Sequence, residues 1–282
     1  MHEGCHGKEG SGRKTAAVSL PGIRNILAVG SGKGGVGKST AAANIAVSLA
    51  LDGAKVGLLD ADIYGPNLPQ MMGIGKYSPK AGPDNKLEPP VGFGVKVISM
   101  GFFVDSDSPV IWRGPMVHGA IVQLLSEVSW GELDYLVVDL PPGTGDAQLS
   151  LCQSVPVSGA VLVSTPQSVA LSDVRKALSM FKSLQVPVLG LVENMAEFAC
   201  PHCGKTSRVF SHGGAKELAE KHGIPLLGSV PLDPLVCETG ESGAPVAASQ
   251  PGSAAAKAFR EIAAKVVERL STAASRRGTQ DF

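Results

Sequence analysis

The chain has 282 residues, of which 44% are hydrophobic and 18% charged, a composition that fits a large core and excludes a disordered chain. Its 25 basic residues balance 25 acidic ones, so we expect no nucleic-acid partner and no anionic membrane partner. No apolar run approaches the ~18 residues of a membrane span, and no apolar signal core follows Met1, so we expect a cytoplasmic protein.

Short apolar runs alternate with helical stretches from Asn25 onward. Runs that are apolar at every position are buried on both faces, which is typical of parallel strands covered by helices. The expected strands are 26–29, 56–59, 135–138, 160–163 and 188–192. The expected helices are 39–51, 116–128, 169–184, 214–222 and 254–270. The pattern predicts an α/β fold with a doubly wound, mostly parallel sheet flanked by helices.

One domain is expected over residues 23–272, between flexible tails at 1–22 and 273–282. Residues 65–94 interrupt the alternation, since they are rich in Pro and Gly and show little periodicity. We expect a long loop there, and such loops inside compact domains are usually functional or mobile.

A glycine-rich loop follows the first expected strand and opens the first helix, with the sequence Gly32-Lys33-Gly34-Gly35-Val36-Gly37-Lys38-Ser39-Thr40. Its glycines fit a dinucleotide fingerprint, and the same segment fits the phosphate loop G-x-x-x-x-G-K-[ST]. Lys38 and Ser39 favour the phosphate loop, because a triphosphate needs a cation at its β/γ oxygens and a hydroxyl on Mg²⁺. We predict that the whole segment binds a nucleoside triphosphate.

Acidic residues close two further strands. Asp139 supplies the carboxylate that such a loop requires for Mg²⁺. Asp60 and Asp62 lie just beyond the second strand, at the sheet edge where ligands bind. Asp62 could orient the attacking water and Asp60 could join the metal shell, although Asp residues also form turns. Lys33 is either a solvated side chain or a lysine that reaches the phosphates of a facing subunit.

The base is expected to be adenine. Loops that read guanine usually offer an Asn-Lys-x-Asp run, which this sequence lacks. Asn194 follows the strand at 188–192 and carries the donor and acceptor groups that suit an adenine edge.

A cysteine pair, Cys200 and Cys203, lies in a loop at 198–206. Two thiolates at this spacing can share a metal, but a closed site needs four ligands, and a two-fold dimer would bring two pairs together. Ligand count leaves Zn²⁺ and an iron–sulfur cluster both open, and a redox dithiol or a metal-free turn remain alternatives. Cys152 in an expected helix and Cys237 in an expected loop show no second pair.

Together these segments resemble the Mrp/ApbC family of P-loop ATPases, relatives of MinD and ParA that act as iron–sulfur cluster carriers. The phosphate loop alone marks only the wider MinD-like group, and the cysteine pair with the segment 63–66 makes the match specific. The matching segments are 31–40, 60–66, 139–146, 193–195, 200–204 and 231–234, which run in family order across residues 20–250.

The resemblance implies that ATP is bound and slowly hydrolysed in a homodimer. It places Lys33 at the partner's nucleotide, Ser39 and Asp139 around Mg²⁺, Asp62 near the hydrolytic water and Asn194 near adenine. Lys33, Lys38 and Asp62 are then the catalytic side chains.

The same resemblance implies a [4Fe-4S] cluster bridged by Cys200 and Cys203 of both subunits and passed to apo-proteins. Some relatives carry an N-terminal four-cysteine cluster site, which we do not expect here because Cys5 is the single cysteine of the tail. The alternatives are a MinD/ParA-like positioning ATPase and an ATPase with a structural zinc at the dimer interface.

Overall fold

The computed structural model describes residues 18–63, 65–82, 84–103, 114–200, 202–210 and 213–278. Its central sheet is built from β1 (Ile23–Ser31), β2 (Val56–Asp60), β5 (Val91–Gly92), β6 (Val95–Ser99), β7 (Leu133–Asp139), β8 (Gly159–Ser164), β9 (Val188–Glu193) and β12 (Leu226–Ser229). The order across the sheet is β12-β9-β8-β1-β7-β2-β6-β5, and every described pairing is parallel except that of β5 with β6. The predicted doubly wound, mostly parallel sheet is confirmed.

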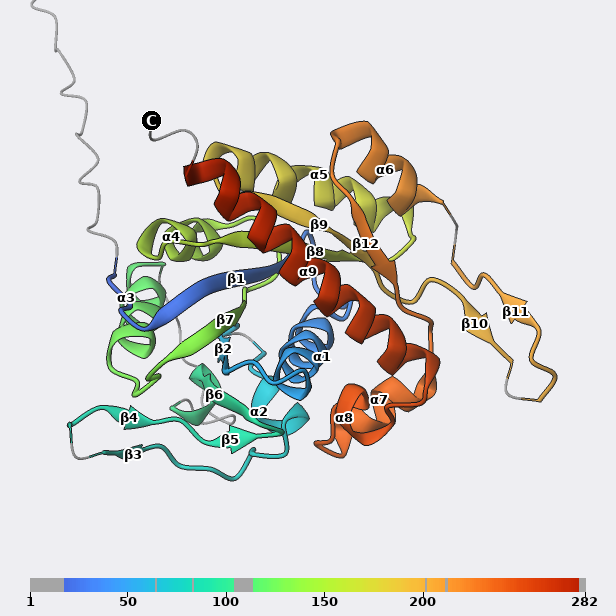
Figure 1. Ribbon diagram of the computed structural model, residues 1–282. Coiled ribbons are helices and arrows are strands. Elements are labelled where there is room, and N and C mark those ends of the chain that lie inside the picture. Colours follow the sequence, from blue (N-terminus) through green and yellow to red (C-terminus); the bar gives the residue numbers. More distant parts are fainter. Residues whose placement is uncertain are drawn as a thin grey trace, which may run out of the picture.

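Helices cover both faces of this sheet (Figure 1). One face packs against α3 (Gly114–Ser126), α4 (Asp146–Ser154), α5 (Ser168–Ser183) and α6 (Gly214–His222). The other packs against α1 (Lys38–Leu51), α2 (Leu68–Met71), α7 (Pro234–Glu241), α8 (Val246–Ser249) and α9 (Ala254–Gly278). Alternate residues of β1 serve the two cores, since Ile26 and Ala28 face the first and Leu27 and Val29 the second.

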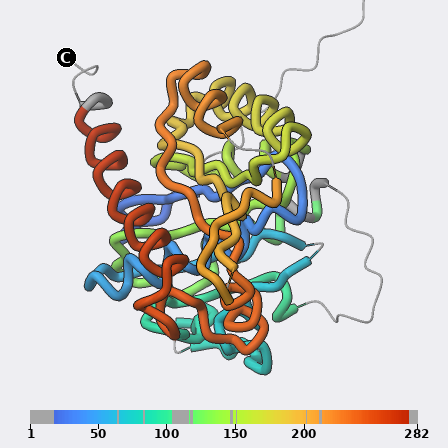
Figure 2. Tube along the Cα trace, turned by 90° about the vertical axis from the view of Figure 1, so that its right-hand side faces the viewer, coloured from blue at the N-terminus to red at the C-terminus, as the bar shows by residue number. Residues whose placement is uncertain are grey.

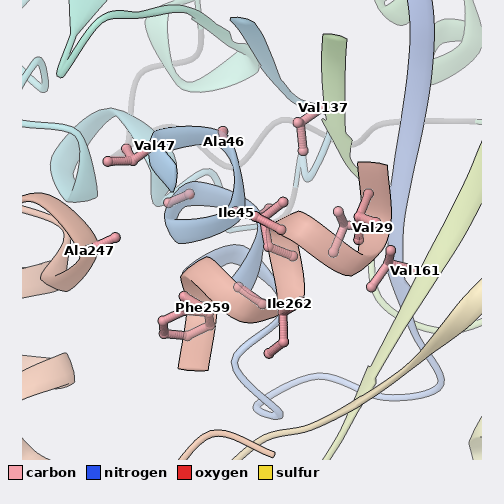
Figure 3. Close-up of a cluster of buried hydrophobic side chains, with 14 of the residues drawn as sticks. Val29, Ile45, Ala46, Val47, Val137, Val161, Ala247, Phe259 and Ile262 are labelled. Carbon is pink, nitrogen blue, oxygen red and sulfur yellow. The ribbon is translucent and has the colours of Figure 1, made fainter. Parts of the chain in front are cut away.

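Helix α1 lies between the sheet and α9 and is buried around most of its circumference. Ile45 and Val47 of α1 and Phe259 and Ile262 of α9 are all fully buried, and Figure 3 shows them in one cluster with strand valines. The polar Asn44 is also buried, and its Oδ1 accepts a hydrogen bond of 2.9 Å from the backbone N–H of Ala247 at the start of α8. A helix fixed on every side gives the phosphate loop at its N-terminus a rigid support.

The structure differs from the sequence expectations in several places. Residues 65–94 contain α2, β5 and a small sheet of β3 (Lys80–Ala81) and β4 (Leu87–Glu88). Strands β6 and β12 were not expected, α4 was expected only as a helix around Cys152, and α7 was not expected. Cys237 lies in α7 and not in a loop. Helix α9 continues past residue 270 to Gly278, into the expected C-terminal tail.

The expected N-terminal tail is described only from Val18, whose N–H donates to the carbonyl of Ser154 at 2.7 Å. Cys5, Tyr64 and Pro201 lie outside the described residues. Within the described ranges, no helix has both the length and the apolarity to cross a membrane.

Candidate nucleotide and cysteine sites

The phosphate loop connects β1 to α1 at the carboxyl edge of the sheet. Strands β7 and β2 end at the same edge, because Val29 is in register with Asp139 and Asp139 with Asp60. Parallel strands therefore bring the three predicted elements of the site together: the loop, Asp139 and the carboxylates that follow β2.

Lys38 lies at the centre of a buried charge cluster. Its Nζ is 2.7 Å from Asp139 Oδ1 and 3.7 Å from Asp62 Oδ2, and it donates to Ser39 Oγ at 3.3 Å. The side chains of Lys38 and Asp139 are 6% and 0% exposed. Burial raises the pKa of Asp139, and the charge and hydrogen bond of Lys38 oppose that rise. The lysine thus neutralises a carboxylate that water does not reach.

Asp139 has one oxygen left over. Its Oδ2 is buried and has no hydrogen-bond partner among the described residues. A buried carboxylate oxygen without a partner is costly unless something else satisfies it. Carboxylate and hydroxyl oxygens are the ligands that Mg²⁺ prefers, so Asp139 and the neighbouring Ser39 fit the metal site predicted for them.

Asp60 is engaged differently. Its Oδ1 accepts from the N–H of Asp62 at 3.1 Å, and its Oδ2 accepts from Ser99 Oγ at 2.9 Å and from the N–H of Leu68 at 3.3 Å. These bonds tie β2 to the end of β6 and to the start of α2. A place in the metal shell stays a prediction for Asp60, and the structure gives it an organising role that the sequence did not reveal.

Asp60 makes the stability of the nucleotide-free chain depend on pH. Burial, with a contribution from nearby Asp139, raises the pKa of Asp60 from 3.8 to about 8. The folded chain therefore keeps this proton at pH values where the unfolded chain loses it, and the free energy of unfolding falls as pH rises from about 4 to about 8. We expect Asp60→Asn to flatten that slope in guanidinium unfolding between pH 5 and pH 8. Equal slopes for the variant and the parent protein would contradict this role.

A cavity of about 430 Å³ opens beside the phosphate loop. Its walls come from the loop, α2, the segment after β9, the segment after β12 and α7. The lining residues are Gly37, Thr40, Asn67, Gln70, Met71, Asn194, Met195, Pro231, Leu232, Asp233, Val236, Cys237, Gly240 and Glu241. Asn194 lies in this wall next to the loop, and its contact to a base stays a prediction.

Asn194 also contacts the loop directly. The side chain is 6% exposed and its Nδ2 donates to the carbonyl of Val36 at 2.9 Å. A Cβ at Gly37 would lie 2.2 Å from this Nδ2. The amide oxygen Oδ1 is the group that this bond does not use.

Gly37 and Gly35 form a matched pair for mutation. Both have positive φ, 80° and 78°, but a Cβ on Gly35 would meet nothing within 4 Å. Gly35→Ala carries only the backbone strain, roughly 1–2 kcal/mol. Gly37→Ala must also displace Asn194, so we expect the larger loss of ADP affinity in calorimetric titration. A smaller loss for Gly37→Ala than for Gly35→Ala would show that the contact with Asn194 is unimportant.

Lys33 contacts a different segment of the fold from Lys38. Its Nζ donates to Gln167 Oε1, just before α5, at 3.4 Å. The loop packs closely on α5, because a Cβ on Gly32 would lie 2.4 Å from the carbonyl carbon of Asp173. Lys33 is half-buried and lies away from the Lys38 cluster, and its predicted reach to a partner's nucleotide stays a prediction.

The cysteine pair lies in a hairpin of β10 (Phe198–Ala199) and β11 (Thr206–Ser207), which projects from the body in Figure 1 and faces the viewer in Figure 2. The N–H of Cys200 donates to Lys205 O at 3.0 Å, and the N–H of Gly204 donates to Cys200 O at 2.8 Å. Hydrogen bonds from the backbone N–H groups of His202 and Cys203 lower the pKa of the Cys200 thiol. The turn is thus already shaped to favour a thiolate, the form that binds metals.

Among the described cysteines, only Cys200 and Cys203 lie in this hairpin. The described residues contain no group of three or more His, Cys, Asp or Glu side chains that could hold a metal. Burial raises the pKa of Cys152 to about 12, as expected for a core residue, and Cys237 lies in the wall of the cavity. The structure brings neither of them to the pair.

The parallel sheet, the phosphate loop with Lys38 and the strand-end carboxylate Asp139 define a P-loop NTPase. Residues 22–267 match the sequence profile of the ParA family described as NUBPL iron-transfer P-loop NTPase, and the chain belongs to this family. The predicted class, a P-loop NTPase of the iron–sulfur cluster carriers, is confirmed.

The chain is also similar to individual members of this family and to MinD. The chain is 49% identical over 93% of its length to the iron-sulfur cluster transfer protein NUBPL of Dictyostelium discoideum, covering 82% of that protein. It is also 49% identical to the iron-sulfur cluster carrier protein of Pseudomonas fragi, over 88% of each chain. A nucleotide-binding protein from Archaeoglobus fulgidus, solved in complex with ADP, is 43% identical with a TM-score of 0.72 over 79% of this chain and 88% of that one. The cell division ATPase MinD of Pyrococcus furiosus is 25% identical, with a TM-score of 0.64 over 86% and 98% of the two chains.

Sequence reasoning missed four parts of the site: Ser99, Gln167 and the cavity walls formed by α2 and α7. A signal for α7 is present, since Asp233 accepts from the N–H of Leu235 as an N-cap and Pro234 occupies the first turn. Ser99 could be found only by recognising β6.

Proposed function

We propose that two copies of this chain hold one [4Fe-4S] cluster between their cysteine hairpins and deliver it to apo-proteins under the control of ATP. The observation that carries the proposal is the hairpin itself: an exposed turn with N–H groups directed at Cys200 and, among the described residues, no third metal ligand beside Cys200 and Cys203. A cubane cluster takes four thiolates, which two hairpins related by a two-fold axis would supply. The names of the relatives support an iron–sulfur cargo.

ATP is the nucleotide that the cavity favours. The Nδ2 of Asn194 donates to the carbonyl of Val36. The amide oxygen Oδ1, a hydrogen-bond acceptor, is therefore the group that can contact a base. An exocyclic amine such as that of adenine can donate to it, whereas the O6 of guanine would repel it.

Mg²⁺ would be held by Ser39 and Asp139. The Oδ2 of Asp139 has no hydrogen-bond partner among the described residues and could bind the ion. Bound there, the ion would supply charge stabilisation at the β/γ phosphates. Lys38 must exchange part of its pairing with Asp139 and Asp62 for the phosphates, which would release Asp62 to orient a water. Lys33 of one subunit would add positive charge at the partner's nucleotide, so hydrolysis depends on the dimer.

The proposal is tested by measuring transfer of the cluster to an apo-enzyme. The protein, loaded with iron and sulfide without oxygen, should restore activity to an apo-enzyme that needs a [4Fe-4S] cluster, and ATP should change the rate. Protein that contains stoichiometric zinc, acquires no iron and activates no recipient would instead indicate a structural metal.

A further inference from the structure

Four residues that lead from β9 into the cysteine hairpin also contact the phosphate loop. This segment, residues 194–197, begins at Asn194, whose N–H donates to Ser164 O at 2.7 Å and whose side chain binds the carbonyl of Val36. It ends at the start of β10 (Phe198–Ala199), and Cys200 follows β10 directly. Asn194, which is hydrogen-bonded to the phosphate loop, thus lies at the base of the cysteine hairpin.

The same segment forms part of the cavity. It continues the ladder between β9 and the chain after β12, because the N–H of Ala196 donates to Val230 O at 3.0 Å and the N–H of Leu232 donates to Glu197 O at 2.8 Å. Leu232 lines the cavity. The base of the hairpin and a wall of the cavity are therefore hydrogen-bonded to each other.

Met195 is held in an uncommon conformation at this junction. Its φ is 58°, in the left-handed region that non-glycine residues rarely adopt, and its side chain lines the cavity. The residues on either side of it, Asn194 and Ala196, are both hydrogen-bonded to other segments. We expect a segment held in this way to transmit a displacement of the cavity wall to the hairpin, whereas a flexible segment would absorb it.

We propose that the nucleoside part of the nucleotide, seated in this cavity, sets the position of the cysteine hairpin through residues 194–197, with Asn194 as the positioning residue. The inference rests on the proposed function and names its route of control. A base pressing on Met195 and Leu232 moves backbone that is shared with the hairpin. Because ADP and ATP carry the same base, ADP alone must produce the effect. By reciprocity, a ligand on the thiols must change nucleotide affinity by the same factor.

The cysteines of the chain report on this route in one experiment. The full-length protein, reduced and metal-free under anaerobic conditions, is alkylated with iodoacetamide with and without ADP, and each cysteine is followed by mass spectrometry. Cys237 lines the cavity, so its protection measures occupancy. We expect saturating ADP to change the alkylation rates of Cys200 and Cys203 by at least about fivefold, the lower end of typical coupling between sites.

Asn194→Asp is the decisive variant, because it keeps an oxygen toward the cavity and removes the donor to Val36. At equal protection of Cys237, we expect the response of Cys200 and Cys203 to disappear. Asn25→Asp is the matched control, since it also removes an amide donor to a backbone carbonyl, that of Asp134, but lies at the start of β1 and outside the cavity lining, so it should keep the response. An intact response in Asn194→Asp would overturn the proposal, as would an effect in the parent protein that grows with protein concentration and so reflects contact between subunits.

Amide hydrogen exchange of the parent protein keeps the proposal testable if Asn194→Asp fails to fold. ADP should slow exchange across residues 196–207, and unchanged exchange at full occupancy would refute the route. Such a failure would leave ADP binding and cluster loading intact, and so would be distinguishable from failure of the proposed function.

Discussion

Lys38→Ala is expected to lower the affinity for ATP and ADP by at least about 30-fold, the effect of losing one buried charge contact worth ~2 kcal/mol or more. The Nζ of Lys38 lies among Asp139, Asp62 and Ser39, where the β/γ phosphates of a nucleotide on this loop would compete for it. Isothermal titration with ADP measures the loss. Lys176→Ala is the control. Lys176 forms an exposed ion pair with Asp173, so this variant should bind ADP with normal affinity.

The same substitution should also destabilise the nucleotide-free chain. It leaves Asp139 buried without its cation, which typically costs ~3–5 kcal/mol. The double variant Lys38→Met with Asp139→Asn removes both charges and should recover most of that stability without recovering binding. An undiminished affinity in Lys38→Ala, or binding restored in the double variant, would show that Lys38 does not contact the phosphates.

Cys200→Ala is expected to eliminate the brown visible absorption that iron and sulfide give the protein on reconstitution. In a cluster shared by two hairpins, each substituted chain removes one ligand, so the variant dimer keeps only two of the four thiolates. Cys203→Ala should behave alike. The measurement is the visible spectrum with iron and sulfide analysis, and bound iron should fall close to zero.

Cys237→Ala is the matched control for this result. Cys237 is exposed, like Cys203, but lies in α7, in the wall of the cavity, so its substitution should leave the spectrum unchanged. A normal spectrum in Cys200→Ala would exclude the hairpin as the cluster site. Loss of the spectrum in Cys237→Ala would require a ligand set that the structure does not bring together.

The parts of the site that follow from local chemistry could be predicted from the sequence. The loop, Lys38 and Asp139 are found by motif, because a phosphate site needs those residue types at those positions, and a parallel sheet brings strand ends to one edge. The continuous apolar runs identified the central strands for the same reason, since burial on both faces leaves no alternation.

The parts that depend on contacts between distant segments could not be predicted. The three bonds of Asp60 come from Asp62, Ser99 and Leu68, and the last two approach from an unrecognised strand and helix. Strands β3 and β4 are two residues each, and β4 is held by bonds between Leu87 and the segment 127–129. No local periodicity records such partners.

Native mass spectrometry of the anaerobically reconstituted protein tests the central claim most directly. We predict a dimer that carries four iron and about four sulfide ions, and that separates into cluster-free chains when the cluster is lost. Cys200→Ala should not retain iron under the same conditions. A cluster-loaded single chain, or a protein that stays monomeric with iron and ATP present, would contradict a cofactor held between two hairpins.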